Sequence, residues 1–240
     1  MIYLFRIYQL FIAVPLCVAL TIVTSIITII GCIFSNGRFW GYYPAKIWAM
    51  IFCWLNFITV SVKGRQNIDS ATSYVFVANH QGAFDIFAIY GFLGHNFKWM
   101  MKASLRKIPF VGYACYKAGH IFVDRTSPTA IRQSLKQAES RLSSGMSLVV
   151  FPEGSRTKTG RMGNFKRGAY ILAEEFNLPV VPVTIDGAFA ILPRNSRYPL
   201  PRPGHIRLTI HQPIVAAEGG HDINDLMQQS REAIESGFGH

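Results

Sequence analysis

The chain has 240 residues, of which 50% are hydrophobic and only 15% are charged, with a formal net charge of +11. This length allows one α/β domain with a full core plus an appendage, and the low charge content is lean for a freely soluble protein. The four cysteines show no metal-ligand spacing, which argues against a structural zinc site or a disulfide framework. The default expectation is therefore a globular domain on the cytosolic side.

The first sixty residues are strongly apolar. No charged side chain occurs over residues 7–37, and the central part, 10–34, exceeds the roughly 20 residues that cross a bilayer. Residues 39–62 are also apolar and carry several Trp and Tyr, which favour the headgroup boundary. We expect residues 1–62 to form an N-terminal hydrophobic two-helix membrane motif. It would either cross the bilayer twice or lie in one leaflet, and packing of both helices as ordinary core is the alternative.

The remaining residues, 63–240, alternate short apolar runs with helical periodicity. Strands are predicted over residues 74–78, 120–124, 147–151, 180–185 and 206–210. Helices are predicted over residues 85–92, 128–144, 168–176 and 222–236. The stretch between residues 92 and 120 reads as irregular and basic, and the loop 193–204 as irregular. This alternation predicts an α/β domain with a mostly parallel sheet flanked by helices.

A histidine and an aspartate follow the first predicted strand of this domain. Asn79, His80 and Asp85 come directly after the apolar run, and Gly82 permits a turn that brings the carboxylate back to the imidazole. A carboxylate partner fixes the tautomer of the ring and stabilises the imidazolium that forms when it takes a proton. No Ser, Cys or Thr is placed beside the pair as a nucleophile, so His80 would act as a base on a substrate hydroxyl. A purely structural histidine is the alternative.

A second polar motif, Phe-Pro-Glu-Gly-Ser-Arg-Thr at residues 151–157, follows another predicted strand. Ligands of open α/β sheets gather outside the carboxyl ends of the strands, so the two motifs can face one crevice. Arg156 offers a planar fork suited to phosphate, and Glu153 can orient it or bind a hydroxyl. The alternative is a surface ion pair between Glu153 and Arg156 that closes a turn.

The positive charge is concentrated between and around these motifs. Residues 98–167 hold fourteen Lys or Arg against three acids. Lys102 begins a stretch that mixes cations with apolar side chains and leads to Arg125. Such a mixture suits a surface that touches both a phosphate and a lipid chain, although solvated surface charge explains each cation equally well on its own.

Together the motifs resemble the 1-acyl-glycerol-3-phosphate acyltransferases, also called lysophosphatidic acid acyltransferases. Four blocks match in order and spacing: Asn79-His80 with Asp85, residues 102–112 with 121–125, residues 151–157, and residues 181–185. In the third block, Ser155 stands where that family more often has Thr, and it keeps the hydroxyl.

The resemblance implies an acyl transfer. His80 would deprotonate the free sn-2 hydroxyl of lysophosphatidic acid, which then attacks the thioester of acyl-CoA or acyl-carrier protein, while Asp85 orients His80. The resemblance also implies residues that bind the substrates, with a phosphate role for the three cations: Lys102, Arg125, Glu153, Gly154, Ser155 and Arg156.

It further implies that the enzyme uses neither a metal nor a prosthetic group and that a tunnel in or near the N-terminal motif measures the acyl chain. Membrane phospholipid is the expected environment, at the inner or plasma membrane with the catalytic domain on the cytoplasmic face. No nucleic-acid-binding motif is present, so nucleic acid is not an expected partner.

Two other enzyme types stay open. One is an acyltransferase that acts on glycerol 3-phosphate or another lysophospholipid, with the same catalytic pair. The other is a metal-dependent phosphatase that uses His80, Asp85 and Glu153 as ligands. Activity that persists in excess chelator would exclude this alternative.

Overall fold

The computed structural model describes residues 2–35, 37–124, 127–143, 145–197, 199–215 and 222–239. Within these ranges the chain forms a seven-stranded sheet with the order β1-β7-β6-β2-β5-β3-β4. Neighbouring strands are parallel except for the antiparallel pair of β6 and β7, so the predicted mostly parallel α/β sheet is confirmed. The strands are β1 (Ile58–Lys63), β2 (Val75–Ala78), β3 (Phe97–Lys102), β4 (Ile121–Val123), β5 (Ser147–Val150), β6 (Val180–Asp186) and β7 (Gly204–Ile210).

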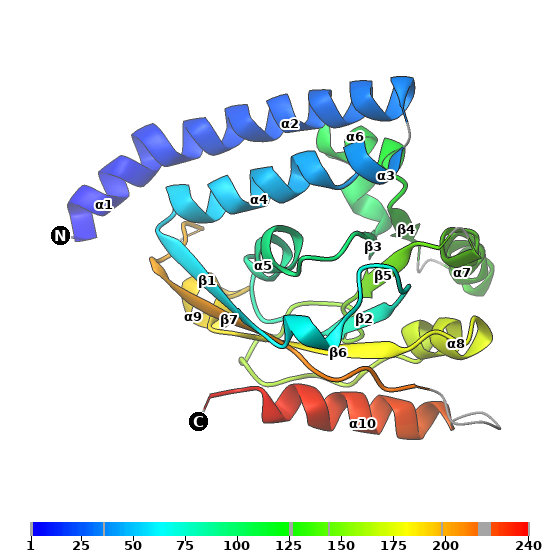
Figure 1. The fold of residues 1–240 in the computed structure, drawn as a ribbon. Helices are drawn as coiled ribbons and strands as arrows, with labels where there is room; N and C mark the ends of the chain where they lie inside the picture. Colours follow the sequence, from blue (N-terminus) through cyan, green and yellow to red (C-terminus); the bar gives the residue numbers. More distant parts are fainter. Residues whose placement is uncertain are drawn as a thin grey trace.

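Helices cover both faces of the sheet. Figure 1 shows α5 on one face with α4 and α2 stacked above it, and α8 and α10 on the opposite face. A π-helical turn, Gln9–Ala13, joins α1 to α2, and a 3-10 turn, Ala103–Lys107, precedes α6. The helices are α1 (Ile2–Tyr8), α2 (Val14–Phe34), α3 (Gly37–Trp40), α4 (Tyr43–Leu55), α5 (Asp85–Phe92), α6 (Val111–Lys117), α7 (Pro128–Ser143), α8 (Gly168–Glu175), α9 (Ala188–Ile191) and α10 (Ile223–Ser236).

Strand β2 lies at the centre of the core. All four of its residues are buried. Phe76 packs with residues of α4 and α5, whereas Val75 and Val77 pack with residues of α7, α8 and α10. A strand that is buried on both faces is apolar at every position, which is why this one is evident in the sequence.

Two strands were not predicted. Residues 58–62, assigned to the second apolar segment of the N-terminal motif, lie in β1, which pairs with β7 at the edge of the sheet. The predicted boundary at residue 62 thus falls inside a strand, and the division into two domains stays a prediction. The other is β3, which lies in the stretch expected to be irregular. Its two lysines interrupt the apolar pattern that makes a buried strand evident in a sequence.

The long helix α2 exposes large apolar side chains and buries small polar ones, which is the opposite of the pattern in soluble proteins. Large apolar residues such as Val23 and Ile30 are exposed, whereas Ser25 and Thr28 are buried. The span Tyr3–Phe34 is long and apolar enough to cross a membrane by length and composition, and only 17% of its most apolar window is buried in the protein. Burial therefore does not account for the apolar composition of this span.

Lys98 of β3 is a buried cation. Its side chain is 4% exposed, and Nζ donates a hydrogen bond to the Gly37 carbonyl oxygen at 3.1 Å. Burial lowers the pKa of Lys98 from 10.5 to about 8, against an opposing effect of Cys32. The folded protein therefore carries an ammonium ion whose hydration is largely lost.

Replacing Lys98 by Met retains most of the buried stem and removes this charge. Because the pKa of Lys98 is about 8 in the folded state against an ordinary 10.5, unfolding takes up a proton between these values and wild-type stability rises with pH across this window. Below the window, K98M should be more stable than wild type by about 1–3 kcal/mol, after allowance for the lost hydrogen bond. Thermal unfolding in one detergent across this pH range measures the effect. An advantage that does not shrink toward high pH would contradict it.

Candidate active site

The two polar motifs lie side by side because β2 and β5 are neighbouring parallel strands, with Val77 opposite Val150. Each motif begins where its strand ends, so both project from the same edge of the sheet. Asn79 anchors the first motif: its side chain donates to the Ile185 carbonyl oxygen at 2.8 Å and accepts from the Ile185 backbone N–H at 2.7 Å. The start of the loop over residues 79–84, named the catalytic loop here for its candidate catalytic His80, is thus tied to β6 as well as to β2.

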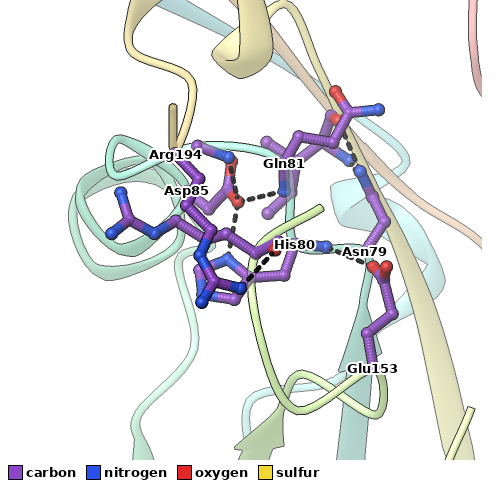
Figure 2. A network of polar contacts seen from close by, with 9 residues as sticks. Asn79, His80, Gln81, Asp85, Glu153 and Arg194 are labelled. Atoms are coloured by element: carbon purple, nitrogen blue, oxygen red, sulfur yellow. Dashed lines mark hydrogen bonds and ion pairs between the residues drawn. The ribbon is translucent and has the colours of Figure 1, made fainter. Parts of the chain in front are cut away.

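The predicted His80–Asp85 contact is present. The Nδ1 atom of His80 lies 2.8 Å from Oδ2 of Asp85, whose side chain is fully buried in the first turn of α5. The same oxygen accepts the backbone N–H groups of Gln81 at 2.6 Å and Gly82 at 2.9 Å (Figure 2). Gly82 is required here because a Cβ atom would lie 2.5 Å from the carbonyl oxygen of Ala188. The carboxylate therefore fixes the turn and the imidazole at once.

The other edge of the imidazole faces a cavity. The His80 ring stacks on Phe151, with centroids 4.0 Å apart and planes 7° apart, and Phe151 in turn stacks on Trp99. Among the described residues no protein group bonds Nε2, and His80 is one of the residues that line the cavity. An imidazole held at Nδ1 by a carboxylate, with Nε2 directed to a cavity, has the geometry of a general base.

Glu153 connects the two motifs through the backbone. Its Oε1 atom accepts the backbone N–H of His80, and its Oε2 atom accepts the backbone N–H of Gly163, both at 2.7 Å. The His80 carbonyl oxygen accepts from the Thr157 backbone N–H at 2.9 Å. An ion pair of Glu153 with Arg156, the alternative considered from the sequence, is not among the contacts of the described residues. Glu153 acts here as a clamp on the catalytic loop (Figure 2).

Sequence reasoning missed Arg194, which the fold brings to the second motif. Its Nη1 atom donates to the Arg156 carbonyl oxygen at 3.3 Å, and Figure 2 shows it in the same network as His80 and Asp85. A β-bridge between Gly82 and Pro193 carries the preceding loop alongside the catalytic turn. The sequence offered only one weak signal, the arginines of a proline-rich loop.

The remaining predicted site residues separate into three groups. Lys102, Gly154 and Ser155 line the cavity together with His80. Arg156 is partly buried and is not one of the lining residues. Arg125 lies outside the described residues.

The cavity has a volume of about 1000 Å³ and extends between the N-terminal helices and the sheet. One wall comes from α2 through a stripe of hydroxyl side chains. These are Thr21, Thr24, Ser25 and Thr28. Two further lining residues, Tyr90 and His120, bond each other through the hydroxyl and Nε2 at 2.9 Å. Burial lowers the pKa of His120 well below its usual value, so this polar pair is uncharged.

Metal ligands are not gathered in the described part of the chain, where no three His, Cys, Asp or Glu side chains are arranged to hold an ion. The expectation of a metal-free enzyme stays a prediction. The groups gathered at the site are an imidazole, a buried carboxylate and nearby cations.

Replacing Glu153 by Gln tests the clamp. The amide retains one acceptor oxygen and sets an NH₂ group against the second backbone N–H, so the donor of His80, which is part-buried, or that of Gly163, which is exposed, loses its charged acceptor. We expect a loss of about 1–3 kcal/mol in stability and lower activity from the looser catalytic loop. Thermal unfolding and turnover measured together test both effects, with Glu174→Gln on the exposed side of α8 as the matched control. Unchanged stability and turnover would show that the two bonds do not hold the loop.

Residues 59–186, more than half of the chain, match the protein family described as Acyltransferase. The 1-acyl-sn-glycerol-3-phosphate acyltransferase LPAT1, chloroplastic, of Arabidopsis thaliana is 33% identical over 195 residues, which are 81% of this chain and 54% of the relative. The BAT2 protein of Brassica napus, named for the same activity, is 35% identical over 178 residues, 74% of this chain and 51% of the relative. The chain spans about half the length of these curated relatives.

A solved structure is also similar. The crystal structure of the 1-acyl-sn-glycerophosphate acyltransferase PlsC from Thermotoga maritima has a TM-score of 0.71 and 30% identity, covering 80% of this chain and 76% of that one. The family match includes both motif loops and the strands from β2 to β6. With these similarities and the His80–Asp85 geometry, the chain belongs to the acyltransferase family.

Proposed function

We propose that this protein transfers an acyl group from an acyl thioester to the sn-2 hydroxyl of 1-acyl-glycerol 3-phosphate, giving phosphatidic acid. The observation that carries the proposal is His80, whose Nδ1 is held by Asp85 and whose Nε2 faces a cavity large enough for a lipid chain. The similar proteins support the choice of acceptor, since they are named as acyltransferases of 1-acyl-glycerol 3-phosphate.

The reaction follows from the position of the base. Nε2 of His80 takes the proton of the acceptor hydroxyl as the oxygen attacks the thioester carbonyl carbon. The tetrahedral intermediate collapses with cleavage of the C–S bond, and the imidazolium returns the proton to the thiolate. Asp85 stabilises the imidazolium through Nδ1, and base catalysis of this kind contributes about 10²- to 10⁴-fold in rate.

Cations near the base supply the site for the acceptor phosphate. Lys102 lines the cavity, and Arg194 contacts the backbone of Arg156 beside the catalytic loop. Guanidinium groups bind phosphate oxygens in a bidentate manner, which fixes the direction of the glycerol as well as its position. We assign the phosphate to Lys102, Arg156 and Arg194, with Arg125 as a further ligand on the strength of its motif.

The cavity is assigned to the acyl chain. Each buried methylene contributes about 0.8 kcal/mol, so a chain in this cavity gains several kilocalories per mole that a short acyl group would not. The donor is acyl-CoA or acyl-carrier protein. An acceptor with another headgroup would use the same base and is the alternative.

The exposed apolar side chains of α1 and α2 are assigned to the membrane. The inward hydroxyls and outward aliphatic groups of α2 fit a helix whose outer face contacts lipid rather than water. The catalytic domain would then lie at the cytoplasmic face of the inner or plasma membrane, where its lipid acceptor and product are found.

Replacing His80 by Ala should lower turnover by at least 10²-fold because it removes the base that we assign to the reacting hydroxyl. The assay follows thiol release from acyl-CoA by purified protein supplied with lysophosphatidic acid, glycerol 3-phosphate or lysophosphatidylcholine, with excess chelator throughout. The variant should retain the wild-type melting temperature within a few degrees. Retained turnover would rule out His80 as the base, and a preference for another acceptor would revise the substrate.

Replacing Arg194 by Ala should raise the KM for lysophosphatidic acid about tenfold or more, with little change in the KM for the acyl donor, because a charge-assisted bond to phosphate is lost. Arg156→Ala should act in the same direction. Arg197, an exposed arginine of the same loop, is the matched control and its replacement by Ala should leave both constants near wild type. Equal changes in the KM for the donor and for the acceptor would show that Arg194 has a structural role and does not bind the phosphate.

A further inference from the structure

A second apolar surface lies on the catalytic domain, away from α1 and outside the catalytic pair. Four large side chains between Ala103 and Ala118 are about half exposed, although soluble proteins rarely expose contiguous apolar groups without a partner. They are Ile108 (43%), Phe110 (51%), Tyr113 (50%) and Tyr116 (46%). We call this group, with the cations described below, the 106–117 patch.

The arrangement of α6 produces this surface. Tyr113 and Tyr116 are three residues apart and so lie on one side of α6, Phe110 is the residue that caps its N-terminus, and Gly112 and Ala114 are buried. The ring centroids of Tyr113 and Tyr116 are 6.3 Å apart, so these two rings form a stripe that begins at the helix end capped by Phe110. Replacing the stripe would leave the buried side of α6 in place.

The backbone at Phe110 is strained. Its φ is 60° and its ψ is −56°, and the Val111 backbone N–H donates to the Pro109 carbonyl oxygen at 2.7 Å, which closes a γ-turn of the rare positive-φ kind. Such a conformation costs on the order of 1–3 kcal/mol and is found mainly at functional positions. Half of the Phe110 side chain is nevertheless exposed, so burial in the protein does not repay the strain.

Cations are placed among the rings. The Arg106 guanidinium lies 4.2 Å from the centroid of the Tyr116 ring, and Lys117 Nζ lies 5.5 Å from that of Tyr113. Lys107 is exposed beside them. The sequence has no acid from residue 86 to residue 123, so every Lys and Arg of this segment adds to one sign of charge. Aromatic rings with flanking Lys and Arg are typical of the headgroup boundary, where the ring is buried and the cation meets lipid phosphate.

The patch is continuous with the apolar face of α2 and with the cavity. Helix α6 packs against α2, and Figure 1 shows it beside the C-terminal part of that helix. Ile108 and Val111 line the cavity on this side, and Thr24 and Thr28 of α2 line it on the other. The patch therefore forms one rim of the cavity that holds His80.

We propose that the 106–117 patch is a second membrane contact, in which Phe110 and Tyr113 enter the headgroup boundary of an anionic bilayer and Arg106, Lys107 and Lys117 bind lipid phosphates. Continuity with α2 and the positive charge favour a lipid surface over a protein partner. Only its role as an entrance for the lipid acceptor, between α6 and α2, depends on the proposed function.

Photocrosslinking tests the contact independently of activity. The full chain carries p-benzoylphenylalanine in place of Phe110 and is reconstituted in vesicles of phosphatidylglycerol or of phosphatidylcholine. We expect an adduct with the mass of one phospholipid, formed in higher yield with phosphatidylglycerol. The same amino acid in place of Lys136, an exposed residue of α7, should give no lipid adduct. A protein–protein adduct at position 110, or no adduct, would overturn the proposal.

One double variant tests the charged part of the patch, and another, described below, tests its apolar part. With Arg106→Gln and Lys117→Gln, the crosslink yield in phosphatidylglycerol should fall about fivefold toward the phosphatidylcholine value, because each cation near an anionic surface contributes to binding. Lys136→Gln with Lys166→Gln removes the same charge elsewhere and should leave the yield unchanged.

Phe110→Ser with Tyr113→Ser should raise the apparent KM for acceptor presented in vesicles by about tenfold or more, because two exposed rings that would be buried in the bilayer are lost. Turnover on acceptor in detergent micelles should stay at the wild-type value, and so should the melting temperature. An equal loss in micelles would mean that the rings support the fold. If the crosslink forms while the wild type shows no acyl transfer, the membrane contact stands and the proposed function fails.

Discussion

The site depends on the hydrogen bonds of one buried group, the carboxylate of Asp85. Removing a carboxylate from water is costly unless hydrogen bonds replace its hydration. Oδ2 of Asp85 receives three of them, from the imidazole of His80 and from the backbone of Gln81 and Gly82. One oxygen thus binds both the ring and the turn that carries it. The bonds that compensate for the burial of this oxygen are therefore also the bonds that order the loop, whereas Oδ1 is buried without a hydrogen-bond partner among the described residues.

The rest of the molecule holds this loop from the outside. Asn79 ties it to β6, Glu153 ties it to the loop after β5, and the bridge from Gly82 to Pro193 ties it to the loop that carries Arg194. All of these bonds involve the backbone. The N-terminal helices form one wall of the cavity. Arg6 and Gln9 donate hydrogen bonds to the Pro201 carbonyl oxygen, so the proline-rich loop that carries Arg194 also contacts the N-terminal helices.

The sequence predicted the parts of the fold that depend on local pattern. Strand β2 and helix α5 were expected nearly at their observed bounds, and so was the His80–Asp85 contact, because a strand, a glycine turn and a helix start determine it locally. Strand β3 was missed because Lys98 looks like a surface residue in a sequence, and only the tertiary structure shows it buried. The part played by Glu153 could not be foreseen for a related reason, since its partners are backbone groups. Arg194 depends on a bridge between loops more than one hundred residues apart.

The hydroxyl-lined wall of α2 and the 106–117 patch extend the same logic to the membrane. An apolar helix that turns its small polar residues inward leaves its aliphatic side chains for lipid, and α6 adds rings and cations at the next position along that surface. His80, the cavity and the apolar surface are thus adjacent, so under the proposed function a lipid acceptor would move only a short way from the bilayer to His80.

The tautomer of His80 tests the account most directly. Nitrogen-15 NMR of the imidazole, assigned by comparison with the His80→Gln variant, reports which ring nitrogen carries the proton in the neutral ring. If Asp85 holds Nδ1–H, the account predicts a protonated Nδ1 and an unprotonated Nε2, and Asp85→Ala should mix the two tautomers. A proton resident on Nε2 in the wild-type protein would contradict the assignment of His80 as the base.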